Sequence, residues 1–196
     1  MPGPAAALLV AAGLTTPPDF QELRQDESCR YLVSETPESW PTLRAECLWP
    51  QVAPSALTRL LGDWASYARH FSTIASSEVV GPMGAATAVH HVHTAPLMAD
   101  REALLLFWQE PAGTAQAFRW TLAPGQPPVA RGRVALARDT GHWTVAPNPD
   151  GPGSLVVSEL AYDPGGRVPD ALVHWFQQVG VAAFVDELAE AVSAQP

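Results

Sequence analysis

Residues 162–176 read Tyr-Asp-Pro-Gly-Gly-Arg-Val-Pro-Asp-Ala-Leu-Val-His-Trp-Phe, and the expected architecture of the chain follows from this stretch. Its two glycines predict a turn, and Pro169 then stands where the first turn of a helix tolerates proline. From Leu172 to Val192 apolar residues recur at helical spacing. They predict a helix of about 25 residues, which would be about 37 Å long and would cross a small domain.

Upstream of this helix, from about residue 74, the hydrophobic pattern is typical of strands separated by Gly/Pro turns. The expected strands are residues 77–80, 86–94, 103–109, 116–122, 129–137, 142–146 and 154–162, preceded by residues 27–33 and 42–49. We expect a short helix in residues 19–26 and a second helical segment in residues 53–71, with Ser55 as its N-cap. No helix interrupts the later strands, so they favour an antiparallel meander. The sequence thus predicts an α+β fold in which a curved antiparallel sheet wraps around the long C-terminal helix.

The two cysteines lie on the first two expected strands. Cys29 and Cys47 are each nine residues from Glu38, the centre of the connecting turn. Residues opposite each other in an antiparallel pair are about 4.5–5.5 Å apart, which is within the range of a disulfide. The spacing predicts either a Cys29–Cys47 disulfide or two small buried residues that face each other.

Residues 4–14 are small and apolar, with the length of the hydrophobic region of a signal peptide, but no Lys or Arg precedes them. Residues 1–18 are therefore interpreted as a signal peptide or a disordered leader, and residues 19–196 as one folded domain. Together with the cysteines, this favours a periplasmic or secreted bacterial protein. A cytoplasmic location follows if the stretch is not a signal peptide.

Composition argues against several classes of function. The net charge of −9 argues against binding nucleic acid or an anionic membrane surface. The chain has no lysine, which excludes Schiff-base chemistry on a lysine. His91 and His93 share a strand face but lack a third metal ligand, and no nucleophile motif is present. We expect no catalytic residue, no metal and no cofactor.

Four segments resemble, in order and spacing, the StAR-related lipid transfer (START) domain family. They are the glycine turn at residues 163–169, the strand start Pro-Leu-Met-Ala-Asp-Arg-Glu at 96–102, the strand Gly-His-Trp-Thr-Val-Ala-Pro at 141–147, and the strand at 154–162. The resemblance covers residues 19–196 and implies a helix-grip fold. It also implies a protein that binds or transfers a lipid or other apolar small molecule and needs no chemistry to do so. We further expect a monomer that makes transient contact with a membrane. The ligand would lie in a pocket between the sheet and the C-terminal helix.

The residues expected to contact the ligand are aromatic, aliphatic or histidine side chains of the strands and helices around this pocket: Trp64, His91, His93, Leu105, Phe107, Trp120, Trp143, Leu172, Trp175, Phe176 and Val179. Phe107 stands where sterol-binding members of the family have an arginine, so we expect a more apolar interior here. Two alternatives remain at this point. One is a cyclase or aromatase of the same superfamily that uses a pocket histidine, and the other is a protein-interaction module whose rings fill the core.

Overall fold

The computed structural model describes residues 19–34, 40–94, 97–168 and 180–194. The expected leader at 1–18 and the expected first half of the C-terminal helix lie outside the described residues. Four of the expected ligand contacts, Leu172, Trp175, Phe176 and Val179, therefore also lie outside them.

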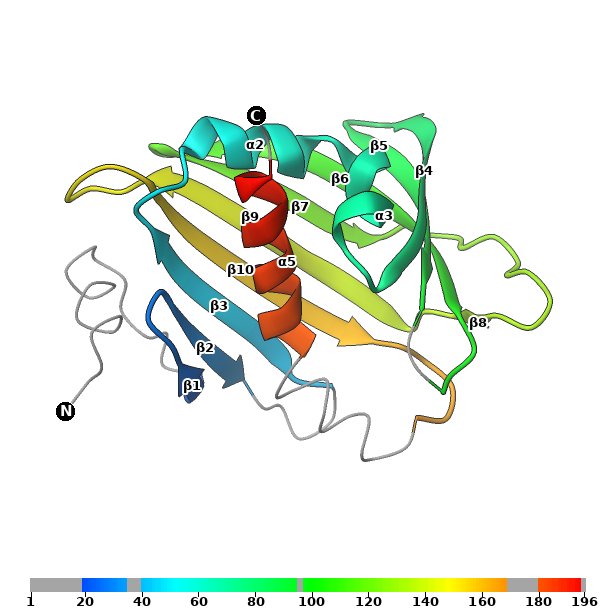
Figure 1. Ribbon diagram of the computed structural model, residues 1–196. Coiled ribbons are helices and arrows are strands. Elements are labelled where there is room, and N and C mark those ends of the chain that lie inside the picture. The colour runs from blue at the N-terminus through cyan, green and yellow to red at the C-terminus, as the bar shows by residue number, and fades with distance from the viewer. Residues whose placement is uncertain (1–18, 35–39, 95–96, 169–179, 195–196) are drawn as a thin grey trace.

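One large sheet forms most of the described structure (Figure 1). Its strands are β1 (Gln21–Gln25), β2 (Cys29–Ser34), β3 (Thr42–Trp49), β4 (Ile74–Met83), β5 (Ala86–His93), β6 (Arg101–Ala112), β7 (Ala115–Leu122), β8 (Val134–Ala135), β9 (Arg138–Pro147) and β10 (Ser154–Asp163). They lie in the order β1-β2-β3-β10-β9-β7-β6-β5-β4, and β8 adds a short parallel pairing to β6. All other pairings are antiparallel. Apart from β8, the strands from β4 to β10 form the expected antiparallel meander, in which β7 pairs directly with β9. Strand β3 pairs with β10 and so joins the N-terminal strands to it.

The helices gather on one face of this curved sheet (Figure 1). They are α2 (Pro54–Gly62), the 3-10 helix η1 (Trp64–Ser66), α3 (Tyr67–His70) and α5 (Val181–Ser193). Helix α5 crosses the sheet, and α2 contacts β7, β9 and α5. The α+β helix-grip architecture predicted from the sequence is confirmed.

The core lies between α5 and the inner face of the sheet. Inward-pointing side chains alternate along each strand, as Leu43, Ala45 and Cys47 do on β3, and all three are buried. Val185 and Leu188 of α5 are buried against them in the same cluster. Burying a leucine side chain contributes about 1.5–3 kcal/mol, so this shared cluster holds the helix on the sheet.

Three local expectations were wrong. Residues 19–26 do not form a helix, because Gln21–Gln25 pairs with β2 as an edge strand. Ala53, not Ser55, is the N-cap of α2, and Pro54 takes the first helical position. Of residues 129–137 only Val134–Ala135 is a strand, since Ala130 donates its backbone N–H to the Glu102 carboxylate at 2.8 Å instead of to a strand neighbour.

The disulfide alternative for the cysteines is confirmed. Cys29 and Cys47 are direct partners in the β2–β3 register, their Cα atoms are 4.1 Å apart, and they form a disulfide. Both cysteines are buried on the inner face of the sheet.

Removing this bridge is expected to lower the free energy of unfolding. The bridge closes a loop with a sequence separation of 18. Because it restricts the unfolded chain, the double variant Cys29→Ala/Cys47→Ala should lose about 3 kcal/mol. Urea unfolding of the oxidised protein and of the variant measures this loss, and reducing the unmodified protein should reproduce it. Equal midpoints for the oxidised, reduced and substituted forms would contradict the prediction.

Candidate functional site

A cavity of about 260 Å³ lies between the inner face of the sheet and α5. Its walls are mostly aromatic and aliphatic, and they include Tyr67, Ile74, Leu105, Phe107, Trp120, Trp143, Leu160 and Phe184. Helix α5 contributes Ala183, Phe184 and Glu187 to the lining, and its N-cap residue Gly180 lines the cavity as well. The cavity is therefore placed where a molecule would be covered by the helix and supported by the sheet.

Six of the expected ligand contacts line this cavity: His91, His93, Leu105, Phe107, Trp120 and Trp143. Trp64 is not among the lining residues. Its ring instead packs against Phe107, with the ring centroids 5.5 Å apart, so it supports the wall from behind. Whether the six lining residues contact a ligand remains a prediction.

Ring packing fixes the aromatic wall. Phe107 stacks on Trp120 with a centroid distance of 6.2 Å and meets Tyr67 edge-on at 5.9 Å. On the α5 side, Phe184 packs against Trp143 at 5.5 Å. A methyl group at Gly141 would lie 2.5 Å from the ring of Trp120, so only glycine leaves room for the indole at this position of β9.

One corner of the cavity is polar. The Trp120 indole Nε1–H donates to Asp139 at 2.7 Å, and the other carboxylate oxygen of Asp139 lies 3.6 Å from His93 Nε2. Next to this pair, the Nε2 atom of His91 lies 2.9 Å from the Ser77 hydroxyl. The cavity thus has mostly apolar walls and one polar corner. The expectation that its interior is more apolar than that of sterol-binding relatives stays a prediction.

Arg101 also borders the cavity, but backbone carbonyls hold its guanidinium. It donates to Pro164 at 3.2 Å, to Gly165 at 3.4 Å, and to Ala99. These bonds connect the start of β6 to the glycine turn that precedes the C-terminal helix. The role of Arg101 visible in the structure is to hold that turn against the sheet.

Burial shifts the pKa values of the side chains in the polar corner in the direction that favours their uncharged forms. It raises the pKa of Asp139 to about 7, although the hydrogen bond from Trp120 acts in the opposite direction. Burial lowers the pKa of His93 to about 4. Burial, followed by the neighbouring His93 and His90, lowers the pKa of His91 well below its usual value. Both histidines are therefore neutral near pH 7.

Sequence reasoning missed Asp139. It lies on β9 two residues before Gly141 and four before Trp143, so alternation along the strand places it on the same inner face. The expected strand began only at residue 142, and this late start hid the position.

Neither a candidate metal site nor a helix that could span a membrane is found among the described residues. These residues contain no group of three or more His, Cys, Asp or Glu side chains that could hold a metal ion. Within the same part of the chain, no helix is long and apolar enough to cross a membrane.

The ionisation of Asp139 gives a prediction for stability against pH. Its carboxyl group ionises near pH 4 in the unfolded chain and near pH 7 in the folded protein, so the folded state holds more protons between these values. Stability contributed by this group therefore falls as the pH rises through that window. His93 acts oppositely, because its lowered pKa costs stability as the pH falls below about 6.5.

Comparing the protein with its Asp139→Asn variant isolates the carboxyl group. Asparagine retains an acceptor for Trp120, and the histidine contributions are common to both proteins. Between about pH 5 and about pH 8 the free energy of unfolding of the unmodified protein should fall by about 2 kcal/mol relative to that of the variant, because of the raised pKa of Asp139. Urea unfolding at the two pH values measures this difference. Parallel pH dependences of the two proteins would contradict it.

Comparison with known proteins extends this picture. No protein-family model matches the chain, and no curated protein matches it by sequence. A solved structure of a STAR-related lipid transfer protein from Xanthomonas axonopodis is 21% identical and covers 89% of this chain and 99% of its own, with a TM-score of 0.77. Human StAR-related lipid transfer protein 5 is 13% identical and covers 96% of this chain and 93% of its own, with a TM-score of 0.79.

A more distant match is an aromatase/cyclase from Streptomyces. It is 13% identical and covers 78% of this chain and 94% of its own, with a TM-score of 0.54. These identities are low, so the matches establish architecture. The chain has the helix-grip fold of the StAR-related lipid transfer domains, as its four sequence segments predicted.

Proposed function

We propose that this protein binds a lipid or another apolar small molecule in the cavity between the sheet and α5, and carries it without changing it chemically. The observation that supports this most directly is the cavity itself, which has aromatic and aliphatic walls and one polar corner. Pockets for small molecules are typically mostly apolar with a few placed polar groups. A protein-interaction module with a filled core fits this cavity poorly.

The energetics of such binding are favourable. Burying about 300 Å² of apolar ligand surface, at about 25 cal/mol per Å², contributes roughly 7 kcal/mol before the costs of ordering. No bond has to be made or broken, because removal of the ligand from water supplies the driving force.

The surroundings of the cavity are consistent with a carrier in an oxidising compartment. The Cys29–Cys47 disulfide fits a periplasmic or secreted location.

Leu97 is 99% exposed and is followed by Met98, which lines the cavity. An exposed apolar side chain beside the cavity suits transient contact with a membrane from which a monomeric carrier takes up its ligand.

Native mass spectrometry of freshly purified protein, followed by solvent extraction, tests the proposal. We expect a bound apolar molecule, recovered unchanged, and saturable binding of a fluorescent fatty acid at one site per chain. If no apolar molecule co-purifies and no apolar probe binds, the proposal is wrong.

The His93–Asp139 pair favours one second candidate, a cyclase or aromatase acting on a polyketide-like substrate. In such a reaction, a neutral imidazole takes a proton from a carbon next to a carbonyl, a carbon–carbon bond forms, and water is lost. Recovery of a ligand that has lost water after incubation with a poly-ketone substrate would support the enzyme. Recovery of the same molecule unchanged would support the carrier.

A further inference from the structure

The polar corner contains two facing atoms that are too far apart to hydrogen-bond. His93 Nε2 and Asp139 Oδ2 are separated by 3.6 Å, with side chains that are 14% and 4% exposed. Nε2 of His93 is buried and has no hydrogen-bond partner among the described residues. Buried polar atoms are normally paired, so this atom marks a place where a partner is missing.

A single oxygen atom fits between them. An oxygen at a normal hydrogen-bond distance of about 2.8 Å from each atom spans a gap of 3.6 Å. The carboxylate is already fixed, because its other oxygen accepts the Trp120 indole N–H at 2.7 Å. His93 is held on its ring face by Tyr162, with the centroids 5.8 Å apart, and by His91 at 5.4 Å.

We propose that the cavity selects an apolar molecule with one hydroxyl group, whose oxygen bridges His93 and Asp139. This inference rests on the proposed function and specifies the class of its ligand. A hydroxyl group both donates and accepts, so it satisfies this pair whichever of the two side chains carries the proton. A ketone or ether oxygen only accepts, and a carboxylate or phosphate would place a second negative charge beside Asp139 when that residue is ionised.

The cavity also limits the shape of the ligand. Its volume of about 260 Å³ is slightly below the range of about 300–1,000 Å³ that is typical of small-molecule pockets. Rings of Phe107, Trp120 and Trp143 line it, and flat rings pack well on such walls. A compact alcohol that contains rings therefore fits better than a lipid with two long chains.

The test compares three probes that share one ring system: 2-naphthol, 2-methoxynaphthalene and 2-naphthoic acid. Their dissociation constants for the unmodified protein are measured by calorimetry, and by fluorescence of the lining tryptophans. We expect 2-naphthol to bind about tenfold more tightly than the methyl ether, because only the alcohol donates a hydrogen bond. Ionised 2-naphthoic acid should bind more weakly than the alcohol.

A pair of variants locates the preference. His93→Leu should reduce the difference between alcohol and ether to within about twofold, while the ether keeps its affinity. His90→Leu makes the same substitution on the same strand, where His90 bonds Glu102 at 2.8 Å and does not line the cavity. This control should keep the full preference.

The outcomes separate this inference from the proposed function. If all three probes bind with equal affinity, the hydroxyl inference is overturned and the carrier proposal stands. If none binds, both are overturned. A preference that persists in His93→Leu would place the hydroxyl elsewhere and also overturn the inference. The comparison in the unmodified protein is decisive by itself should that variant fail to fold.

Discussion

Replacing Glu46 with glutamine is expected to lower the free energy of unfolding by about 3 kcal/mol or more. The Glu46 side chain is fully buried, and its two oxygens accept hydrogen bonds from Arg30 Nε and, at 2.6 Å, from Arg44 Nε. The Arg30 side chain is only 4% exposed. Glutamine removes the negative charge that balances these guanidinium groups, and it turns an N–H donor towards one of them. Urea unfolding of the two proteins measures the loss.

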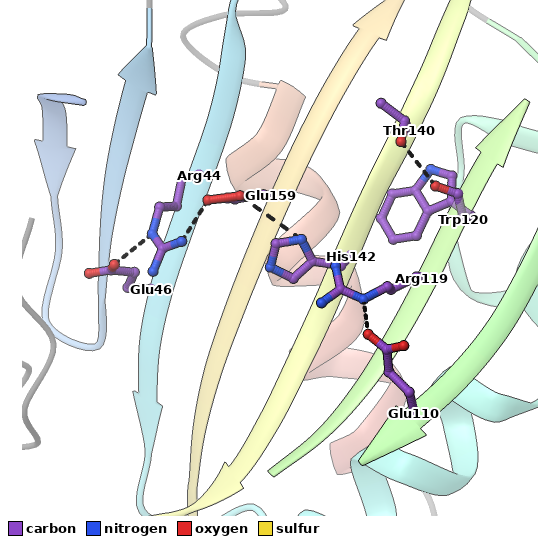
Figure 2. A network of polar contacts seen from close by, with 8 residues as sticks. All are labelled: Arg44, Glu46, Glu110, Arg119, Trp120, Thr140, His142 and Glu159. Carbon is purple, nitrogen blue, oxygen red and sulfur yellow. Dashed lines mark hydrogen bonds and ion pairs between the residues drawn. The ribbon is translucent and has the colours of Figure 1, made fainter. Parts of the chain in front are cut away.

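Glu110→Gln is the matched control. Glu110 accepts a hydrogen bond from Arg119, but these side chains are 45% and 38% exposed. Water therefore screens this pair, and the same substitution should cost less than about 1 kcal/mol. Figure 2 shows both glutamates in a row of charged side chains that crosses the sheet, with Arg44 bonded to Glu159 at 2.7 Å between them. Equal losses in the two variants would mean that burial does not determine the strength of these pairs.

Most of the architecture was predictable, because its determinants are local. The glycine turn at residues 165–166, the change of hydrophobic period near residue 74 and the equal distances of Cys29 and Cys47 from Glu38 are each visible within a short stretch. In the structure both glycines have positive φ angles of 67° and 68°, a conformation that other residues rarely adopt. Local backbone requirements of this kind are recorded directly in the sequence.

Features that depend on sheet order were not predictable. Arg44 and Glu159 are 115 residues apart, and only the β3–β10 pairing makes them neighbours. From the sequence, Arg30 and Glu46 resemble ordinary surface charges, although pairing of their strands buries both.

The polar corner shows the same limit. His93 lies on β5 and Asp139 on β9, and β7 and β6 lie between these strands in the sheet. The two side chains approach to 3.6 Å because the sheet is curved, which the sequence does not show. Trp64 shows a further limit. The family resemblance placed it on a helix that closes the pocket, but the sequence did not decide whether it lines the pocket or packs in the core against rings such as that of Phe107.

Ala183→Phe is expected to abolish most ligand binding. Ala183 lies on α5 and lines the cavity, and α5 crosses the inner face of the sheet (Figure 1). A phenylalanine ring at this position would occupy space within a cavity of only about 260 Å³. Binding of 2-naphthol or of a fluorescent fatty acid should therefore weaken at least about tenfold, since ligand and ring compete for the same volume. Titration of tryptophan fluorescence measures the affinity.

Glu190→Phe is the control for this change, because it adds the same ring to the same helix at an exposed position outside the cavity. It should leave the affinity within about twofold of the unmodified protein, provided that both variants retain a cooperative unfolding transition. The phenylalanine at position 183 adds apolar contacts and also fills the space for a ligand. The free energy of unfolding and the ligand affinity of each variant are therefore measured separately. Equal affinities of the two variants would place the ligand outside this cavity. That result would remove the main physical support for a carrier that shields its ligand between the sheet and α5.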